Sequence, residues 1–183
     1  MTTDAVQTIL RQLPGIEAYP ELVKLVGYCR ELADGRDLPR AEDFHPAQIR
    51  WMFGHLYMAD VVNGGADYRC RLWGQFWETI FGLDLRGMQL SELERAGHVQ
   101  HLRAEYDAIV ADRRARFRVG RVVWPDGKTV NFARVIIPFA DDNGNVSMLL
   151  SGGSSEMSPG DLAFFKGLGM PSFAFDKLSG APA

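Results

Sequence analysis

Four residues in the middle of the chain have types and spacing that could hold a metal. His98, His101, Glu105 and Asp112 stand at positions i, i+3, i+7 and i+14, which share one face of a helix. Histidine and carboxylate at this spacing can bind zinc, and a single histidine can ligate haem iron. The face lies about a quarter-turn from the apolar stripe of the same helix, on the side that meets water. We therefore expect a solvated polar face rather than a metal or haem site; the metal alternative rests on His98 and His101.

A second group is basic. The stretch "RRARFRVGR" holds Phe117 among the arginines Arg113, Arg114, Arg116, Arg118 and Arg121. Such a group could bind a nucleotide or a phosphate, or it could be a helix end followed by a strand with a basic outer face. The net charge of −3 and the pI near 5.8 argue against general polyanion binding. Nucleic acid is therefore not expected, and a small anionic ligand or an acidic partner is the better alternative.

Signatures of common enzyme chemistry are missing from the sequence. It contains no GxSxG, GxxxxGK[ST], CxxC or HExxH motif, so it predicts neither hydrolytic nor phosphotransfer chemistry. The stretch "SGGSSEMSPG" (151–160) is expected to be an exit loop. Two cysteines, Cys29 and Cys70, indicate a reducing compartment, and neither a signal peptide nor a long apolar span is recognisable. We expect a cytoplasmic protein that does not enter the membrane and is not an enzyme.

The elements that must position these residues follow from periodicity. Residues 20–34 are expected to form a helix, with apolar residues recurring at helical spacing: Leu22, Leu25, Val26, Cys29 and Leu32. Residues 55–74 alternate around "NGGAD" and predict a hairpin. The longest helix is expected at 97–114, and strands are expected near 116–124, 129–138 and 145–152.

Neither the hairpin nor the three-stranded meander can bury its apolar face alone. We therefore expect a single α+β domain, with one five-stranded antiparallel sheet and helices packed across one face. In the strand at 129–138, Phe132 is expected to point inward, because an exposed aromatic ring forgoes roughly 2 kcal/mol of burial. That choice also points Arg134 inward, where it needs a carboxylate partner or an anionic ligand.

This order of elements is similar to that of the PAS domain. The stretches that carry the resemblance are "LPRAEDFHPAQIRWMFGHLYMADVV", "DYRCRLWGQFWETIFGLDLRGMQLSEL" and "IIPFADDNGNVSMLLSG". More narrowly, the chain resembles a PAS-like family of short stand-alone alphaproteobacterial proteins. The resemblance implies strand order 2-1-5-4-3 over residues 38–155, after an N-terminal helical extension (1–37) and before a short C-terminal helix and tail (156–183).

The resemblance also implies a sensor or interaction module in signal transduction. Such domains hold a small molecule between the sheet and the long helix, or dimerise through an N-terminal helix, or do both. The candidate cavity wall is Trp77, Phe81, Leu102, Tyr106, Ile109, Phe132 and Arg134. A homodimer is expected through the apolar stripe of helix 20–34, and a signalling protein is a second expected partner.

The alternative is a small α+β enzyme or carrier that acts on an apolar or acidic ligand in the same cavity. Tyr106 is the best catalytic candidate for it. No cofactor is required by the sequence. The photoreceptor subfamily carries an Asn-Cys-Arg-Phe stretch on a helix that precedes the long helix. The corresponding region, "QFWETIFGLDLRGMQLSELERAG", has no cysteine, which excludes a flavin photoadduct.

Overall fold

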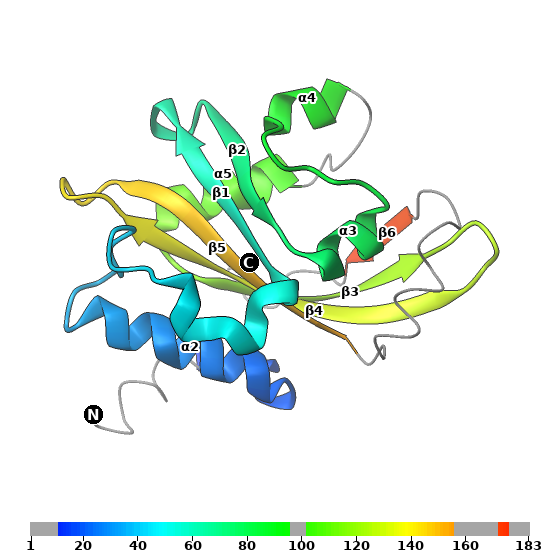
Figure 1. The fold of residues 1–183 in the computed structure, drawn as a ribbon, viewed down its shortest axis with the longest axis horizontal. Helices are drawn as coiled ribbons and strands as arrows, with labels where there is room; N and C mark the ends of the chain where they lie inside the picture. Colours follow the sequence, from blue (N-terminus) through cyan, green and yellow to red (C-terminus); the bar gives the residue numbers. More distant parts are fainter. Residues whose placement is uncertain (1–10, 96–101, 156–171, 176–183) are drawn as a thin grey trace, which may run out of the picture.

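The strands form one antiparallel sheet. The computed structural model describes residues 11–95, 102–155 and 172–175. The sheet has six strands in the order β2-β1-β5-β4-β3-β6 (Figure 1). Their bounds are β1 Leu56–Val62, β2 Asp67–Trp73, β3 Arg116–Val123, β4 Thr129–Ala140, β5 Val146–Ser155 and β6 Ser172–Phe175. The hairpin and the meander join where β1 pairs with β5, so the expected single sheet and the order 2-1-5-4-3 are confirmed.

Two differences from the expected sheet concern its C-terminal end. The added strand β6 pairs antiparallel with β3 and extends the edge. In addition, Ser151–Ser155 belong to β5 and pair with β4. The exit-loop prediction is therefore wrong for these residues, and residues 156–160 lie outside the described part. Glycine is a poor strand former by propensity, but all five residues pair with β4, and Ser151 and Gly152 also pair with β1 on the other side.

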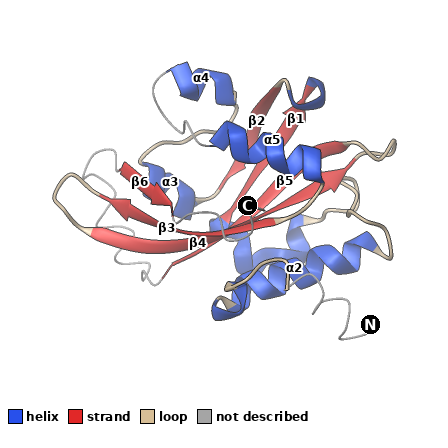
Figure 2. Ribbon diagram, turned by 180° about the vertical axis from the view of Figure 1, so that it is seen from behind, coloured by secondary structure: helices blue, strands red, loops and turns tan. Residues whose placement is uncertain are grey.

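Helices cover both faces of the sheet, as the two ribbon views show (Figures 1 and 2). One face carries α3 (Gln75–Phe81), α4 (Leu90–Arg95) and α5 (Leu102–Asp112). The opposite face carries α2 (Pro20–Ala33) and the 3-10 helices η1 (Ile16–Ala18) and η2 (Pro46–His55). A third 3-10 turn, η3 (Asn63–Gly65), links β1 to β2. The helices between β2 and β3 are on one face, as expected; α2 of the N-terminal extension covers the other together with η2, which belongs to the core domain.

The apolar stripe of α2 packs against the chain's own sheet. Leu22 and Leu25 are fully buried, Val26 and Cys29 nearly so, and Leu32 is half-buried. They share one core cluster with the outer-face residues of β4, which are Ala133, Val135 and Ile137. The stripe that was expected to mediate self-association is thus already occupied. A dimer through these side chains would require α2 to leave the sheet, and a role of α2 in dimerisation stays a prediction.

Consecutive glycines in β5 let helices approach from both sides. Neighbouring strand residues face opposite sides of a sheet. A Cβ at Gly153 would lie 2.5 Å from Phe76 and 2.6 Å from Trp77 of α3, whereas one at Gly152 would meet Leu25 of α2. Only residues without a side chain allow both helices to pack this closely on the central strand.

Within the described residues, no helix is both long and apolar enough to cross a membrane.

Candidate functional site

The expected cavity-wall residues come together on the inner face of the sheet, the face that α3 and α5 cover. Trp77, Phe81, Leu102, Tyr106, Ile109 and Phe132 are all buried in one cluster. The ring of Trp77 meets that of Phe132 edge-on, with centroids 6.2 Å apart. Phe132 and Ile136 face this cluster, while Ala133 and Val135 face the opposite one. The inward orientation of Phe132 is thereby confirmed.

Arg134 also lies inside the fold, and its partner comes from α5. Its side chain is 2% exposed and forms an ion pair with the Glu105 carboxylate, which is equally buried. Arg118 stands directly opposite Arg134 on β3, and its Nε lies 3.2 Å from the other oxygen of Glu105. Two like charges opposite each other repel, so the carboxylate between them offsets that repulsion. Glu105 already supplies the negative charge that pairs with Arg134. The inward position of this arginine therefore gives no support to an acidic ligand.

The prediction of a solvated polar face on the long helix is wrong for Glu105. This residue lies at the edge of the apolar stripe, between the turns of Leu102 and Ile109, and its side chain reaches the arginines of the sheet. Asp112 is exposed and pairs with Arg116. His98 and His101 lie outside the described residues. Within the described residues, no three metal-ligating side chains gather in one place.

Hydroxyl groups add to the polar centre formed by Glu105 and Arg134. Tyr57 is buried beside Tyr106, Ser151 and Arg134. Its hydroxyl lies close to Tyr106 and Ser151, but neither this hydroxyl nor that of Ser151 makes a hydrogen bond of normal geometry to a described residue. Burial raises the pKa of Tyr57, and it raises the pKa of Tyr106 well above the ordinary value. Both phenols therefore remain protonated at neutral pH, which suits them to donate hydrogen bonds to a ligand.

A small cavity adjoins these phenols. Its volume is about 30 Å³, and it lies between the sheet, α4 and α5, with Tyr57, Tyr68 and Tyr106 in its wall. Tyr68 is held in place because its hydroxyl donates a 2.7 Å hydrogen bond to Asp107 of α5. The cavity has room for about one water molecule. Of the expected wall residues, Leu102 and Tyr106 line it, whereas Trp77 and Phe132 pack against each other instead.

The basic stretch does not form one surface patch. Arg113 donates to the Gly144 carbonyl, and Arg116 and Arg118 pair with carboxylates of α5. Phe117 is buried on the opposite face of the sheet. The expected basic outer face is therefore wrong for Arg118, whose side chain is 15% exposed. Arg114 and Arg121 remain at the surface.

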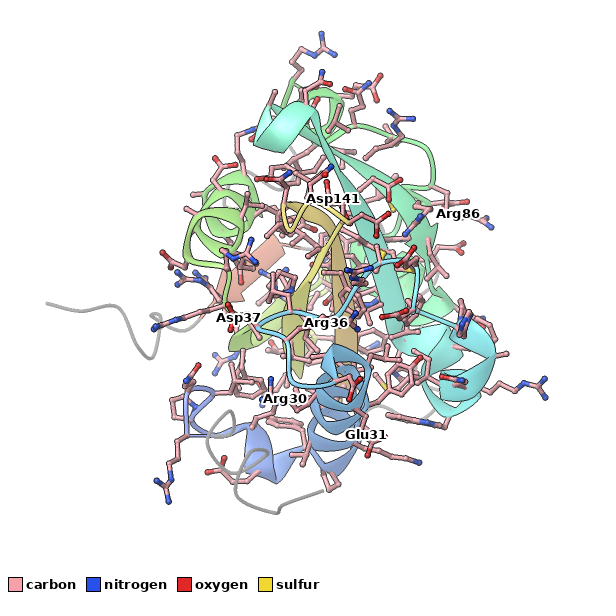
Figure 3. The ribbon with its side chains drawn as sticks, turned by 90° about the vertical axis from the view of Figure 1, so that its left-hand side faces the viewer. Arg30, Glu31, Arg36, Asp37, Arg86 and Asp141 are labelled. Carbon is pink, nitrogen blue, oxygen red and sulfur yellow. The ribbon has the colours of Figure 1, made fainter. Side chains whose placement is uncertain are left out.

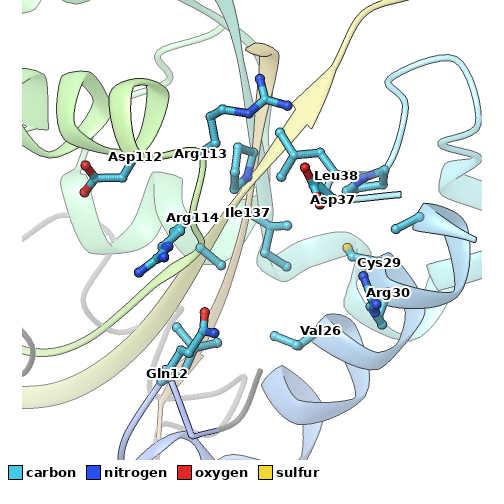
Figure 4. A pocket seen from close by; sticks show the side chains of 15 residues that line it. Gln12, Val26, Cys29, Arg30, Asp37, Leu38, Asp112, Arg113, Arg114 and Ile137 are labelled. Carbon is cyan, nitrogen blue, oxygen red and sulfur yellow. The ribbon is translucent and has the colours of Figure 1, made fainter. Parts of the chain in front are cut away.

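A larger hollow lies on the other side of the sheet, and no sequence pattern pointed to it. Its volume is about 620 Å³, and it is bounded by α2, the connector at 37–39 and the junction of α5 with β3 (Figure 4). Val26, Cys29 and Ile137 contribute apolar wall, and charged side chains stand around the opening. Burial raises the pKa of the Cys29 thiol far above its ordinary value, so this cysteine acts as a small apolar residue rather than a nucleophile.

Comparison with known proteins assigns the family. A family model described as "PAS domain" matches residues 18–152 of the 183. Similar solved structures include an RNA-binding Light-Oxygen-Voltage receptor (15% identity, TM-score 0.43), of which the chain covers 38%, while 71% of the chain is matched. Another is the PAS domain of BvgS from Bordetella pertussis (20% identity, TM-score 0.41, 64% of this chain and 93% of that one). A third is a PAS domain from Colwellia psychrerythraea (17% identity, TM-score 0.41, 60% and 95%).

No curated protein matches the chain. The first of these solved structures is much longer than the matched part, since the chain spans 38% of its length. The family model, in contrast, covers well over half of the present chain, and the sheet has the expected strand order. The chain belongs to the PAS domain family.

Proposed function

We propose that this chain is a signal-transduction sensor that binds a small molecule between the inner face of its sheet and α5. The observation that carries the proposal is the gathering of polar groups inside an otherwise aromatic core: Tyr57, Tyr106 and Ser151 beside the Glu105–Arg134 pair. Ligand pockets typically combine apolar walls with a few converging polar groups. Buried hydroxyls without a well-formed hydrogen bond are costly, and a ligand that bonded to Tyr57 and Ser151 would remove that cost.

The ligand class follows from the groups that are still available. Glu105 already supplies a charge for Arg134, so the ligand need not be an acid. A hydroxyl, carbonyl or amide on a mainly apolar body matches the phenols and the surrounding rings. The cavity of about 30 Å³ is too small for such a body, so binding would have to displace α5 from the sheet. Entry of the ligand would then change the position of a helix, which is how a sensor converts binding into a signal.

Binding is favoured over catalysis at this site. Tyr106, the best catalytic candidate, keeps its proton because burial raises its pKa. Glu105 is held by two arginines, one at each oxygen of its carboxylate. The proposal also includes a cytoplasmic location, self-association and a signalling partner; membership of the PAS domain family supports the last two in general terms.

Native mass spectrometry of the purified full-length chain tests the proposal. We expect a retained small molecule on the wild type. The Tyr57→Phe/Ser151→Ala double variant should lose it, because both hydroxyls that would bond the ligand are removed. Tyr28→Phe is the matched control, since Tyr28 bonds Gln48 on the other face of the sheet. A wild type that carries no small molecule, or a double variant that retains it fully, would contradict the interior site.

A further inference from the structure

A hollow large enough for an organic molecule lies on the outer face of the sheet, the face that α2 covers. Its volume is about 620 Å³, whereas the interior cavity beside the phenols measures about 30 Å³. Pockets that bind drug-sized molecules typically have volumes of about 300–1,000 Å³. The hollow can therefore receive a molecule of that size as it stands, without movement of α5.

Apolar side chains from three parts of the chain form the floor of the hollow. Val26 and Cys29 come from α2, Leu38 from the connector and Ile137 from β4 (Figure 4). All four are buried. Val26 and Cys29 stand three residues apart and therefore share one face of the helix. An apolar body that covers this floor is removed from water, which is the main favourable contribution to the binding of an apolar group.

The side of the hollow formed by α2 and the connector has no net charge. Arg30 and Asp37 both line it and carry opposite charges. Arg30 is fixed near the end of α2, because it donates a 3.1 Å hydrogen bond to the Arg36 carbonyl. Figure 3 labels these three residues near the end of this helix. This side therefore gives no preference for an anion or a cation.

The opposite side, at the junction of α5 with β3, is positively charged (Figure 4). Arg113 and Arg114 line the hollow here, and the left-handed backbone of Arg113 (φ 57°) ends the helix. Arg113 donates to the Gly144 carbonyl, which carries no charge to offset its own. Asp112 also lines the hollow, but its carboxylate is paired with Arg116. Within the described residues, Arg114 makes no ion pair, so its guanidinium is available to an anion.

We propose that this hollow binds an organic anion, with a carboxylate at Arg114 and an apolar body over Val26, Cys29 and Ile137. The planar guanidinium of arginine matches a carboxylate through two parallel hydrogen bonds. A cation of the same shape would meet the positive junction and be repelled. The uneven charge of the wall thus gives the bound molecule one direction, with its head at the end of α5 and its tail toward the connector.

The site goes beyond the proposed function, because it lies on the other face of the sheet from Tyr57 and requires no opening of the interior. A molecule in the hollow contacts α2, β4 and the end of α5 together. Since these elements meet only in the folded chain, binding stabilises their arrangement. The two sites can therefore be occupied independently, and either proposal can fail without the other.

Isothermal titration calorimetry on the full-length chain tests the charge preference with two probes, decanoate and decylammonium, which share one alkyl chain. Decanoate should bind at a single site, and decylammonium should bind about tenfold more weakly or worse. Arg114→Glu should weaken the binding of decanoate about tenfold. Arg114→Lys keeps the charge but loses the paired hydrogen bonds, so its loss should be smaller. The matched control is Arg121→Glu, an equal change of charge at an exposed position of β3 outside the hollow, which should keep the wild-type affinity.

Methyl NMR during the same titration identifies where decanoate binds. The methyl signals of Val26, Leu38 and Ile137 should shift, because these side chains form the floor of the hollow. The methyl signals of Leu102 and Ile109, which belong to the core on the other face, should stay in place. Arg114 and Arg121 are exposed, so their variants should keep the wild-type melting temperature in the absence of the probe.

The proposal is overturned if decanoate does not bind the wild type, or binds no better than decylammonium. It is equally overturned if Arg114→Glu keeps the wild-type affinity, or if the shifted signals are those of Leu102 and Ile109. The last result would place the molecule at the interior site, and it would support the proposed function while contradicting a site in the hollow.

Discussion

The Arg134 guanidinium on β4 and the Glu105 carboxylate on α5 form an ion pair that is buried on both sides, each side chain being 2% exposed. The pair joins the centre of the sheet to the helix above it, across 29 residues of chain. Removing two charges from water is costly, and good geometry with further partners is needed to offset that cost. Arg118 provides such a partner for Glu105. The ion pair thus fixes the position of α5 on the sheet.

Glu105→Gln should destabilise the chain by about 3–5 kcal/mol, because it leaves buried arginines without their carboxylate. Urea unfolding of the full-length chain measures this loss. Combining Glu105→Leu with Arg134→Met should recover much of it, since apolar groups of similar size can replace a buried pair. Asp43→Asn breaks a half-exposed pair with Arg36 and is the control, with an effect within about 1 kcal/mol. A loss for Glu105→Gln no larger than the control would contradict a structural role of the pair.

The sheet could be predicted because the residue patterns that specify its strands and turns are local in the sequence. Alternation around "NGGAD" and the reversals after Trp124 and Ala140 define the strands, and the need to bury two partial sheets joins them. The orientation of Phe132 followed from its size alone. The prediction that Glu105 faces water is wrong because a helical wheel takes no account of the strands that the helix packs against. A carboxylate at the edge of an apolar stripe can lie in water or inside the fold, depending on the side chains that face it. Here two arginines of the sheet face Glu105.

The same limit explains the other differences. A stripe such as that of α2 is equally suited to a sheet or to another helix, so its sequence does not specify the partner. The strand at Gly152 and Gly153 was hidden by the low β propensity of glycine, and the need for glycine at these positions depends on two helices that converge on β5. The small size of the interior cavity could not be predicted, because it depends on how the rings of Tyr68 and Tyr106 pack against each other in its wall.

Gly153→Ala should destabilise the chain by about 1–3 kcal/mol, the usual cost of overpacking a core. The added methyl group would stand 2.5 Å from Phe76 and 2.6 Å from Trp77, so α3 would have to move. Gly152→Ala should have a similar effect through Leu25 and α2. Gly54→Ala is the control, because no atom lies within 4 Å of its added Cβ. Thermal unfolding distinguishes them, and equal melting temperatures for all three would show that α3 and α2 do not depend on these glycines.

Two tyrosines on the inner side should respond in opposite directions when the hydroxyl is removed. Tyr57→Phe in the ligand-free chain should raise stability, because a buried hydroxyl without a well-formed hydrogen bond costs about 1–3 kcal/mol. Tyr68→Phe should lower it by about 1.5–3 kcal/mol, since its hydrogen bond to the Asp107 carboxylate is lost. Urea unfolding compares the two. A loss for Tyr57→Phe equal to that for Tyr68→Phe would mean that the Tyr57 hydroxyl is hydrogen-bonded in solution.

His55 joins the two faces of the sheet and should make stability depend on pH. Its ring stacks on Phe76 at 4.8 Å, and its carbonyl accepts a 2.8 Å hydrogen bond from the Trp77 indole. Burial lowers the pKa of His55 below its ordinary value of 6.5, although a hydrogen bond with the Gly153 backbone and the Glu21 charge oppose this in part. Above pH 6.5 the imidazole is neutral in the folded and unfolded chain alike, so the contribution to stability is complete.

As the pH falls below 6.5, the unfolded chain binds the proton first, and stability is lost until the folded-state pKa has been passed. Urea unfolding between pH 7.5 and 5 should therefore show a decline in the wild type that is reduced in His55→Gln, which cannot titrate. This window lies above the range in which Asp67 titrates, since hydrogen bonds from Ser91 and Tyr68 outweigh its burial and keep the pKa of that carboxyl below 3.8. His45→Gln is the matched control, because His45 is exposed. If His55→Gln keeps the full wild-type decline, the protonation that weakens the fold occurs at another residue.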